Sequence, residues 1–280
     1  MKIIHAAEIV EAVAGLCQEA NFNLGHDMLE GLQRAYEQEV SINGKEIIKQ
    51  LLANAEIARE EKIPICQDTG FTVVFVELGQ DVRVVGGDFY GAINEGVRKG
   101  YTEGYLRKSI VSHPLERENT GDNTPAVIHT KIVPGENIRL IVAPKGGGSE
   151  NMSAVKMLKP SEGVQGLKKF VVEVVKAAGP NPCPPVVVGV GAGGTFEKAA
   201  QLSKEALLRD LGKESQYPDI AKLEKELLDE INRLGIGPQG LGGRITALAV
   251  HIEIYPTHIA SLPVAVNINC HAARHKEAVL

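Results

Sequence analysis

The segment from Leu248 to His275 constrains the fold most, because it combines two apolar runs with a polar turn between them. From Leu248 to Ile254 apolar side chains alternate with His251 and Glu253, which is the period-two pattern of a strand with one buried face. The segment also holds four of the eight histidines and one of the four cysteines, Cys270. We therefore expect strands that end in a turn presenting Cys270. We interpret Cys270 as one ligand of an iron–sulfur site, whose other ligands come from upstream segments.

Helical and strand patterns alternate along the rest of the chain. Residues 2–40 read as helical, and Asn43 is expected to cap a second helix that ends before Pro64. Further helices are expected over 88–104, 161–178 (burying Val164) and 219–234, and strands over 72–78, 127–133, 138–142 and 244–255. The strands 127–133 and 138–142 flank Pro134-Gly-Glu-Asn and predict a hairpin. Residues 105–126 read as a long polar loop.

These elements predict an α+β (mixed α/β) fold rather than an all-parallel doubly wound sheet. A helical N-terminal portion to about residue 63 is followed by a mixed or antiparallel sheet with packed helices. The length of 280 residues and the hydrophobic content of 44% suffice for a sizeable core. We expect a single catalytic-type domain spanning residues 1–280.

Composition excludes several functional classes. A net charge of −5 and an aromatic content of 4% give no nucleic-acid signature. No run approaches the ~18 apolar residues of a membrane span, and Glu8 and Glu11 interrupt any signal-peptide core. Four cysteines, none close in sequence, do not make a secreted disulfide scaffold. We expect a cytoplasmic or organelle-matrix protein with reduced thiols.

Three cysteines share a context that differs from that of the fourth. Cys66 precedes Gln-Asp-Thr-Gly, Cys183 lies between prolines, and Cys270 follows a strand. Cys17 falls on the apolar stripe of a helix, which is typical of a buried core residue. Turns stiffened by proline can hold a thiolate in place, although three unrelated buried thiols fit the same pattern. As ligands, the three suit either four irons, with one iron left open as a Lewis acid, or a zinc site completed by histidine.

Two glycine-rich segments suggest other sites. The run from Gly189 to Gly194 matches G-x-G-x-x-G, follows a strand and opens a helix, as a dinucleotide-binding turn does. However, the acidic residue roughly twenty positions on, Asp210, lies in a predicted helix, so we do not expect a Rossmann fold. Lys145-Gly-Gly-Gly-Ser149 lacks the P-loop order but offers backbone N–H groups and a cation, a nest suited to a carboxylate.

Four ionisable side chains have both a functional and a structural interpretation. Asp68 lies two residues after Cys66, so it either reaches the same pocket or forms an Asx turn ahead of Thr69-Gly70. His258 lies in a loop between two strands and is either a hydrogen-bonded histidine or a catalytic one, whereas His251 simply alternates along a strand. Arg107 in the polar loop either forks onto a carboxylate or is solvated.

Six segments, in chain order, resemble the oxygen-sensitive class I fumarase/L-tartrate dehydratase family. They are Cys66-Gln-Asp-Thr-Gly70, Leu106-Arg-Lys-Ser109, Asn119-Thr-Gly-Asp-Asn-Thr-Pro125, Lys145-Gly-Gly-Gly-Ser-Glu-Asn151, Cys183-Pro-Pro-Val-Val-Val-Gly189-Val-Gly191 and Pro256-Thr-His258 through Asn269-Cys270-His271. The resemblance is to the α-type catalytic domain and runs over nearly the whole chain. Six colinear motifs make it far more specific than any one of them alone.

The resemblance implies a 4Fe-4S cluster on Cys66, Cys183 and Cys270, with one iron lacking a protein ligand. It also implies a set of substrate-site residues near the motifs. Proton transfer falls to Asp68; His258 and Arg107 are expected to touch a dicarboxylate; and Gln67, Gly147 and Gly148 are expected to complete the contacts.

Single-chain members of that family continue into a second, smaller domain that contributes further substrate contacts. Because this chain ends at Leu280, the resemblance implies the α subunit of a two-subunit enzyme, with a β subunit completing the active site and with α:α dimerisation. The expected reaction interconverts fumarate and (S)-malate, and dehydration of L(+)-tartrate to oxaloacetate is the alternative. A non-catalytic iron–sulfur or zinc scaffold would need the thiolates but neither Asp68 nor His258.

Overall fold

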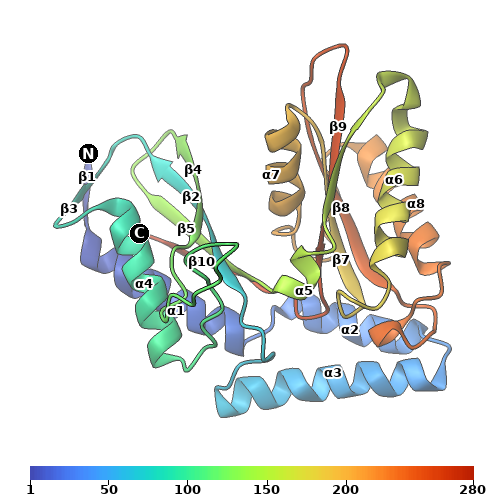
Figure 1. Cartoon of the computed structure of the whole chain (residues 1–280), viewed down its shortest axis with the longest axis horizontal. Helices are drawn as coiled ribbons and strands as arrows, with labels where there is room; N and C mark the ends of the chain where they lie inside the picture. The colour runs from blue at the N-terminus through green and yellow to red at the C-terminus, as the bar shows by residue number, and fades with distance from the viewer. The chain divides into compact units, whose positions relative to one another are not determined.

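Helices and strands are interleaved along the chain, and the strands form three separate sheets (Figure 1). The computed structural model describes all 280 residues and contains two compact units. Unit 1 comprises Met1–Leu24, Ala55–Gly147 and Arg274–Leu280, and unit 2 comprises Gly25–Asn54 and Gly148–Ala273. Parallel and antiparallel strand pairs occur in the same sheets, which confirms the predicted α+β class.

Unit 1 is built around a four-stranded sheet of order β10-β5-β2-β4. β2 lies parallel to β4 and antiparallel to β5, and β1 and β3 form a separate parallel pair. The elements of this unit are β1 (Lys2–His5), α1 (Ala6–Phe22), β2 (Phe71–Gly79), β3 (Val82–Val85), α4 (Phe89–Glu103), β4 (Val127–Val133), β5 (Ile138–Lys145) and β10 (Lys276–Val279).

The core of unit 1 lies between this sheet and the helices α1 and α4. Ile9 and Val13 of α1, Val97 of α4, and Val74 and Leu140 of the sheet are each at most 1% exposed. Buried apolar side chains recur at helical spacing in α1 and at every second position in β2. Each element therefore turns one apolar face to the same core. Cys17 is fully buried here, as its place on the apolar stripe predicts.

Unit 2 contains a second four-stranded sheet of order β6-β9-β7-β8, in which β8 is an edge strand. β7 is parallel to β8 and antiparallel to β9. The elements of this unit are α2 (His26–Gln38), β6 (Ala154–Leu158), η1 (Pro160–Glu162), α6 (Gly163–Ala178), β7 (Val186–Gly193), α7 (Phe196–Ala206), α8 (Pro218–Asn232), η2 (Pro238–Gly240), β8 (Ala247–Tyr255) and β9 (Leu262–Asn269). Two further helices, α3 (Ile42–Glu61) and α5 (Gly147–Glu150), contain residues of both units.

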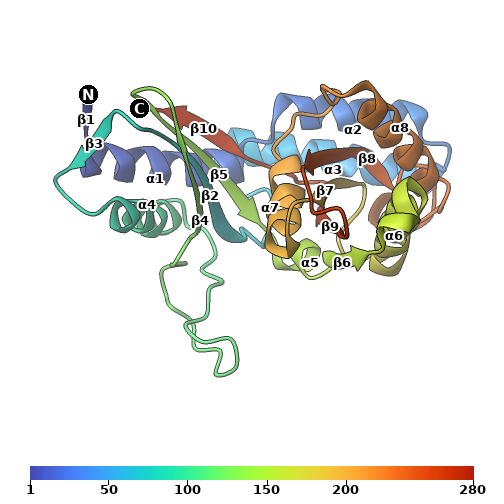
Figure 2. The same ribbon diagram turned by 90° about the horizontal axis from the view of Figure 1, so that it is seen from above.

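The sheet of unit 2 has helices on both faces, with α7 on one side and α6 and α8 on the other (Figures 1 and 2). The larger apolar core lies on the α6 and α8 side, where Val171, Leu227 and Val188 are fully buried. β7 is buried on both faces along its whole length, which is expected of a central strand between two helical layers.

The predicted hairpin of 127–133 with 138–142 is wrong. Both strands form, but β2 lies between them and pairs with each. β2 is the most apolar run of this unit and is buried along most of its length, whereas β4 is mostly exposed. The more apolar strand therefore takes a central position and the more polar one the edge, although the short connection favours a hairpin.

Three smaller predictions are corrected at helix ends and faces. Residues 2–40 form a short strand and two helices rather than one helix, with a break at 23–25. Asn43 lies inside α3 rather than at its cap, because the helix begins at Ile42 and Gly44 N donates to Ser41 Oγ (3.2 Å). Val164 is exposed rather than buried. No helix in the structure combines the length and the apolar character that a membrane crossing requires.

Candidate active site

The Cys66–Gly70 segment of unit 1 forms a tight turn that leads into β2. Asp68 N donates to Cys66 Sγ (3.4 Å), and Gly70 N donates to Asp68 Oδ1 (2.9 Å), which is an Asx turn. Gly70 has a φ of +72°, and a Cβ at this position would lie 2.6 Å from the Lys145 carbonyl. Only glycine fits this turn, so its sequence fixes the direction in which Cys66 and Asp68 point.

Buried side chains from three distant segments hold this turn. Tyr101, which is fully buried in α4, donates to the Thr69 carbonyl (2.8 Å) and the Gly70 carbonyl (3.1 Å). Asn123 Nδ2 donates to the Gly70 carbonyl (3.2 Å), and Arg274 Nη2 donates to the Asp68 carbonyl (2.8 Å). Sequence reasoning assigned no role to Tyr101, Asn123 or Arg274. Asn123 does lie in the Asn119–Pro125 segment that resembles the family, whereas Tyr101 and Arg274 carry no such signal.

Asp68 also connects the turn to the glycine nest. Its Oδ2 accepts a hydrogen bond from Gly147 N (2.8 Å). Both carboxylate oxygens of Asp68 are therefore held by backbone N–H groups, and the structure brings Asp68 and Gly147 together. Gly148 is in unit 2, where a Cβ would lie 3.6 Å from the Asn181 carbonyl.

Gln67 and Arg107 flank the turn with exposed side chains. Gln67 Oε1 accepts from Cys66 Sγ (3.4 Å). Thr69 Oγ1 donates to the Arg107 carbonyl (2.9 Å), which fixes the backbone of Arg107 beside the turn. The Arg107 guanidinium is exposed and makes no hydrogen bond or ion pair within the chain. Its five N–H donors are thus available to a carboxylate.

Cys183 and Cys270 lie at one end of the unit 2 sheet. Cys183 precedes β7 and Cys270 follows β9, and the register pairs Val187 with Asn269. His271 N and His271 Nδ1 lie 3.3 Å and 3.0 Å from the Cys183 carbonyl. Cys183 has a φ of +54°, a left-handed conformation that is rare for a residue other than glycine and concentrates at functional sites.

Gln239 holds the cysteine-bearing turn from the other side. Its backbone N and its Nε2 both donate to the Pro184 carbonyl, at 2.7 Å and 2.9 Å. Gln239 Nε2 also lies 3.1 Å from His271 Nδ1. His271 and Gln239 therefore fix the Cys183 turn against the Cys270 turn, and the sequence alone did not indicate either role.

The structure does not bring His258 near these two cysteines. His258 lies in the turn between β8 and β9, where its Nδ1 accepts from Ala260 N (3.1 Å). Cys270 is at the opposite end of β9, and eight residues at about 3.4 Å each separate the two ends by roughly 27 Å. Within unit 2 His258 cannot touch a group bound by Cys183 and Cys270.

His251 is structural, as its place on a strand predicts. It is 3% exposed, and burial, followed by the positive charge of Arg209, lowers its pKa to about 4. Burial likewise raises the pKa of the Cys17 thiol to about 12, so this cysteine is a poor metal ligand.

The glycines of the G-x-G-x-x-G match pack a helix rather than bind a nucleotide. Gly189 and Gly191 lie inside β7, not in a loop. A Cβ on Gly189 would lie 2.1 Å from the Ser203 carbonyl, and one on Gly191 would lie 2.1 Å from the Ala199 carbonyl. The absent side chains let α7 approach the strand closely, so the predicted absence of a Rossmann site has a packing reason.

The chemistry of the three turn cysteines fits the ligands of an iron–sulfur cluster. None of the cysteines forms a disulfide, and each of the three turn cysteines is at least partly exposed. Their thiols are therefore available as the thiolates that hold such clusters.

Comparisons with known proteins agree with this chemistry. A sequence model described as fumarate hydratase (Fumerase) matches residues 10–279. The chain is therefore an iron–sulfur-dependent hydro-lyase by class. It belongs to the fumarate hydratase (Fumerase) family.

The relatives are named as subunits. The chain is 46% identical over 278 residues to the putative L(+)-tartrate dehydratase subunit alpha of Methanocaldococcus jannaschii, covering 95% of each chain. It is 35% identical over 271 residues to the L(+)-tartrate dehydratase subunit alpha of Escherichia coli K12, covering 95% of this chain and 89% of that one.

Proposed function

We propose that the chain is the α subunit of an iron–sulfur hydro-lyase that interconverts fumarate and (S)-malate. The observation that carries the proposal is the Cys66–Asp68 turn, which presents a thiol and a carboxylate together and fixes both by hydrogen bonds. L(+)-tartrate is the second candidate substrate, because both relatives described above are named L(+)-tartrate dehydratase subunit alpha.

In this proposal Cys66, Cys183 and Cys270 hold a 4Fe-4S cluster. An iron without a protein ligand would supply Lewis acidity toward the hydroxyl group of the substrate.

The chain's own residues then bind the dicarboxylate and move the proton. Arg107 offers a free guanidinium fork to one carboxylate. The Gly148 backbone offers an N–H group to the other, while Gly147, whose N–H is bonded to Asp68, holds the nest in place. Asp68 takes or returns the carbon-bound proton, since its carboxylate is fixed in the same turn as Cys66. Gln67, beside Cys66, orients the substrate.

His258 can serve this site only from another copy of the chain. The roughly 27 Å between the two ends of β9 excludes a contact with its own Cys270. An α:α dimer in which the β8–β9 turn of one copy reaches the site of the other would bring His258 to the dicarboxylate, as the resemblance implies. A β subunit supplies the remaining contacts in the proposed enzyme, in line with the alpha-subunit names of the relatives.

Anaerobic reconstitution with iron and sulfide tests the cluster. Wild type should bind about four irons and develop a broad visible absorbance, Cys183→Ser should bind far less, and Cys17→Ala, which alters a buried core thiol, should match wild type. Equal iron binding by Cys183→Ser would exclude this cysteine as a ligand.

Turnover of (S)-malate, fumarate and L(+)-tartrate by the reconstituted αβ complex tests the reaction. Asp68→Asn with an intact cluster should lose most turnover of whichever substrate is used. The substrate with the larger kcat/KM identifies the enzyme, and the absence of turnover with all three would refute the proposal.

A further inference from the structure

The segment Asn119–Pro125 is one of the six that resemble the family, yet the proposed chemistry uses none of its side chains. It belongs to unit 1, and two of its side-chain amides bond to the backbone of another of the six segments. Asn119 Nδ2 donates to the Lys108 carbonyl (3.0 Å), and Asn123 Oδ1 accepts from Ser109 N (2.7 Å). Both amides therefore hold the short backbone segment that follows the proposed carboxylate-binding arginine.

Three consecutive residues of this backbone are held by side chains. Thr69 Oγ1, from the Cys66 turn, donates to the Arg107 carbonyl (2.9 Å), so residues 107, 108 and 109 are each bonded once. The Arg107 guanidinium itself is exposed and makes no hydrogen bond or ion pair within the chain. A fixed backbone beneath a free side chain is the arrangement that places a binding group without occupying it.

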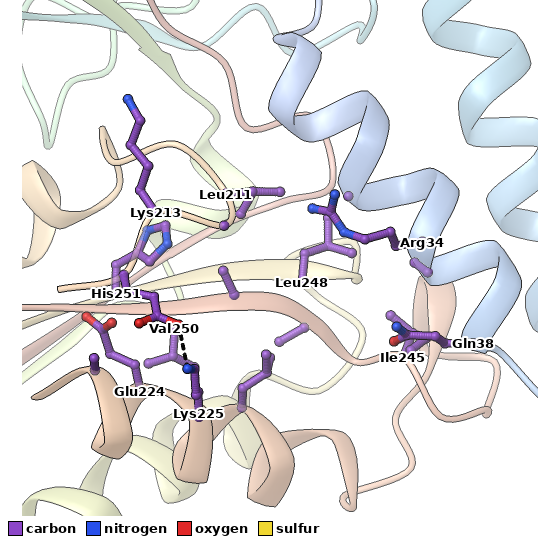
Figure 3. A pocket seen from close by; sticks show the side chains of 18 residues that line it. Arg34, Gln38, Leu211, Lys213, Glu224, Lys225, Ile245, Leu248, Val250 and His251 are labelled. Atoms are coloured by element: carbon purple, nitrogen blue, oxygen red, sulfur yellow. Dashed lines mark hydrogen bonds and ion pairs between the residues drawn. The ribbon is translucent and has the colours of Figure 1, made fainter. Parts of the chain in front are cut away.

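The freedom of Arg107 distinguishes it from the cations around a groove of unit 2. Figure 3 shows Arg34, Lys213 and Lys225 on the lining of that groove. Each is paired with a carboxylate of the chain: Arg34 with Glu30, Lys213 with Asp210, and Lys225 with Glu214. An anion would have to displace these carboxylates, whereas the Arg107 fork needs no such exchange.

Asn123 connects the arginine segment to the turn that carries Asp68. Its Nδ2 donates to the Gly70 carbonyl (3.2 Å) while its Oδ1 accepts from Ser109 N, so one fully buried side chain spans both segments. Ser109 N has no other partner, whereas the Gly70 carbonyl also accepts from Tyr101 (3.1 Å). Loss of the Asn123 amide would therefore free Ser109 and leave the Gly70 turn held.

The backbone of Asn123 is itself fixed in an uncommon conformation. Its φ is +64°, in the left-handed region that asparagine tolerates better than most residues with a side chain. The neighbouring Asp122 Oδ1 accepts from Thr124 N (2.9 Å) and Thr124 Oγ1 (2.8 Å), and Asp122 Oδ2 accepts from Arg98 Nε (2.9 Å). Position 123 thus requires a residue that adopts this φ and also carries one donor and one acceptor. Asparagine meets both requirements, and glycine meets only the first.

We propose that Asn123 is a positioning residue that holds the backbone of Arg107 at a fixed place relative to the turn of Asp68. One carboxylate of a dicarboxylate then meets the guanidinium while the carboxylate of Asp68 reaches the carbon-bound proton. The inference rests on the proposed roles of Arg107 and Asp68. If the backbone beneath Arg107 were free, substrate binding would have to remove its conformational entropy, so affinity rather than the chemical step would suffer.

Amide exchange in the full-length, cluster-free chain tests whether Asn123 holds the segment. Asn123→Gly keeps the left-handed backbone but removes both side-chain bonds, so the Ser109 amide should exchange at least about tenfold faster. Asn94→Ala is the matched control, because Asn94 Oδ1 accepts from Ala126 N (2.8 Å), just beyond the same segment, and bonds to neither Ser109 nor Gly70. In this control the Ser109 amide should exchange at the wild-type rate.

Kinetics of the reconstituted αβ complex test the role in binding. Asn123→Gly should raise KM about tenfold and leave kcat within about twofold of wild type, since it removes positioning and no reacting group. Asn94→Ala should keep both constants within about twofold, even where it lowers stability. In an Arg107→Ala background, Asn123→Gly should raise KM by no more than about twofold further, because its effect passes through Arg107.

Several results would overturn the inference. These are Ser109 exchange in Asn123→Gly at the wild-type rate, a loss of kcat with KM unchanged, an equal rise of KM in Asn94→Ala, or the full tenfold effect in the Arg107→Ala background. Each of these is measured against a wild-type chain or complex that behaves as proposed. Absence of turnover by the wild-type complex would instead refute the proposed function, and with it the role in binding, so the two failures are distinguishable.

Discussion

Acidification should destabilise the fold through His251. This side chain is 3% exposed in β8, and burial is the main cause that lowers its pKa from 6.5 to about 4. Arg209 adds to the lowering, while Ala206, Asp27 and Asp210 oppose it. In the unfolded chain His251 therefore binds a proton as the pH falls through about 6.5, whereas in the folded chain it does so only near pH 4. Stability is full above pH 7 and is lost as the pH falls through this window.

The size of the effect follows from the two pKa values. At pH 5 the difference in proton binding corresponds to about 2 kcal/mol of unfolding free energy, and at pH 4 to about 3 kcal/mol. Urea denaturation followed by circular dichroism at pH 8 and pH 5 measures it. His251→Gln should reduce the pH dependence by about 2 kcal/mol over this range, whereas His26→Gln, whose side chain is 86% exposed, should not. Equal pH dependence in wild type and His251→Gln would refute the reasoning.

Three further predictions address the turn, the helix packing and the copy that supplies His258. Tyr101→Phe removes the donor to two carbonyls of the Cys66 turn, so it should lower the free energy of unfolding in urea by about 1–3 kcal/mol and speed up exchange of the Gly70 amide. Exchange of this amide at the wild-type rate would show that the hydroxyl does not hold the turn. Gly191→Ala places a Cβ 2.1 Å from the Ala199 carbonyl and should cost about 3 kcal/mol or more, so an unchanged melting temperature would contradict the close packing of α7. If His258 acts across an α:α dimer, inactive Asp68→Asn and His258→Ala chains should regain up to about a quarter of wild-type turnover when mixed and reassembled, because half of the dimers are mixed and each has one intact site. No regain on mixing would exclude the shared site.

Local elements were predictable because their signals are local. The helices near 88–104, 161–178 and 219–234 and the strand near 72–78 appear within a few residues of their predicted bounds. Each is set by an apolar period or by turn residues within its own window. The end of a helix is less predictable, as Asn43 illustrates, since Ser41 and Asn43 are both suitable caps and the choice depends on where α3 packs.

Strand order was not predictable because it depends on competition between segments. The turn Pro134–Asn137 favours direct pairing of β4 with β5, yet β2, which precedes both in sequence, pairs with each of them. Burial of β2 on both faces outweighs the closure of a short hairpin. A single sequence does not reveal that a third strand, here β2, will insert between two strands joined by a short turn.

In the candidate site, too, some residues are recognisable from the local sequence and others only from the fold. The motifs identify residues that present chemical groups, such as Cys66, Asp68 and Arg107, because these follow turns with recognisable sequences. They do not identify Tyr101 or Arg274, which lie 31 and 204 residues beyond Gly70 yet hold the turn. Such supporting residues resemble ordinary core or surface residues until the fold brings them to the turn.

The hydrogen bonds of Asp68 determine how its role should be tested. Both of its oxygens accept backbone N–H groups, from Gly70 and Gly147. Asp68→Asn therefore sets an amide NH₂ against one of these donors and leaves a partly buried clash of about 1–3 kcal/mol, in addition to removing a proton acceptor. Lost turnover in this variant would therefore not by itself distinguish a displaced turn from a lost proton acceptor. Tyr101→Phe loosens the same turn without altering the carboxylate, so it is the matched comparison. If Asp68 transfers the proton, Asp68→Asn should lose far more kcat than Tyr101→Phe, and the residual activity of Tyr101→Phe should keep the pH profile of wild type. Equal losses would assign Asp68 to holding the turn.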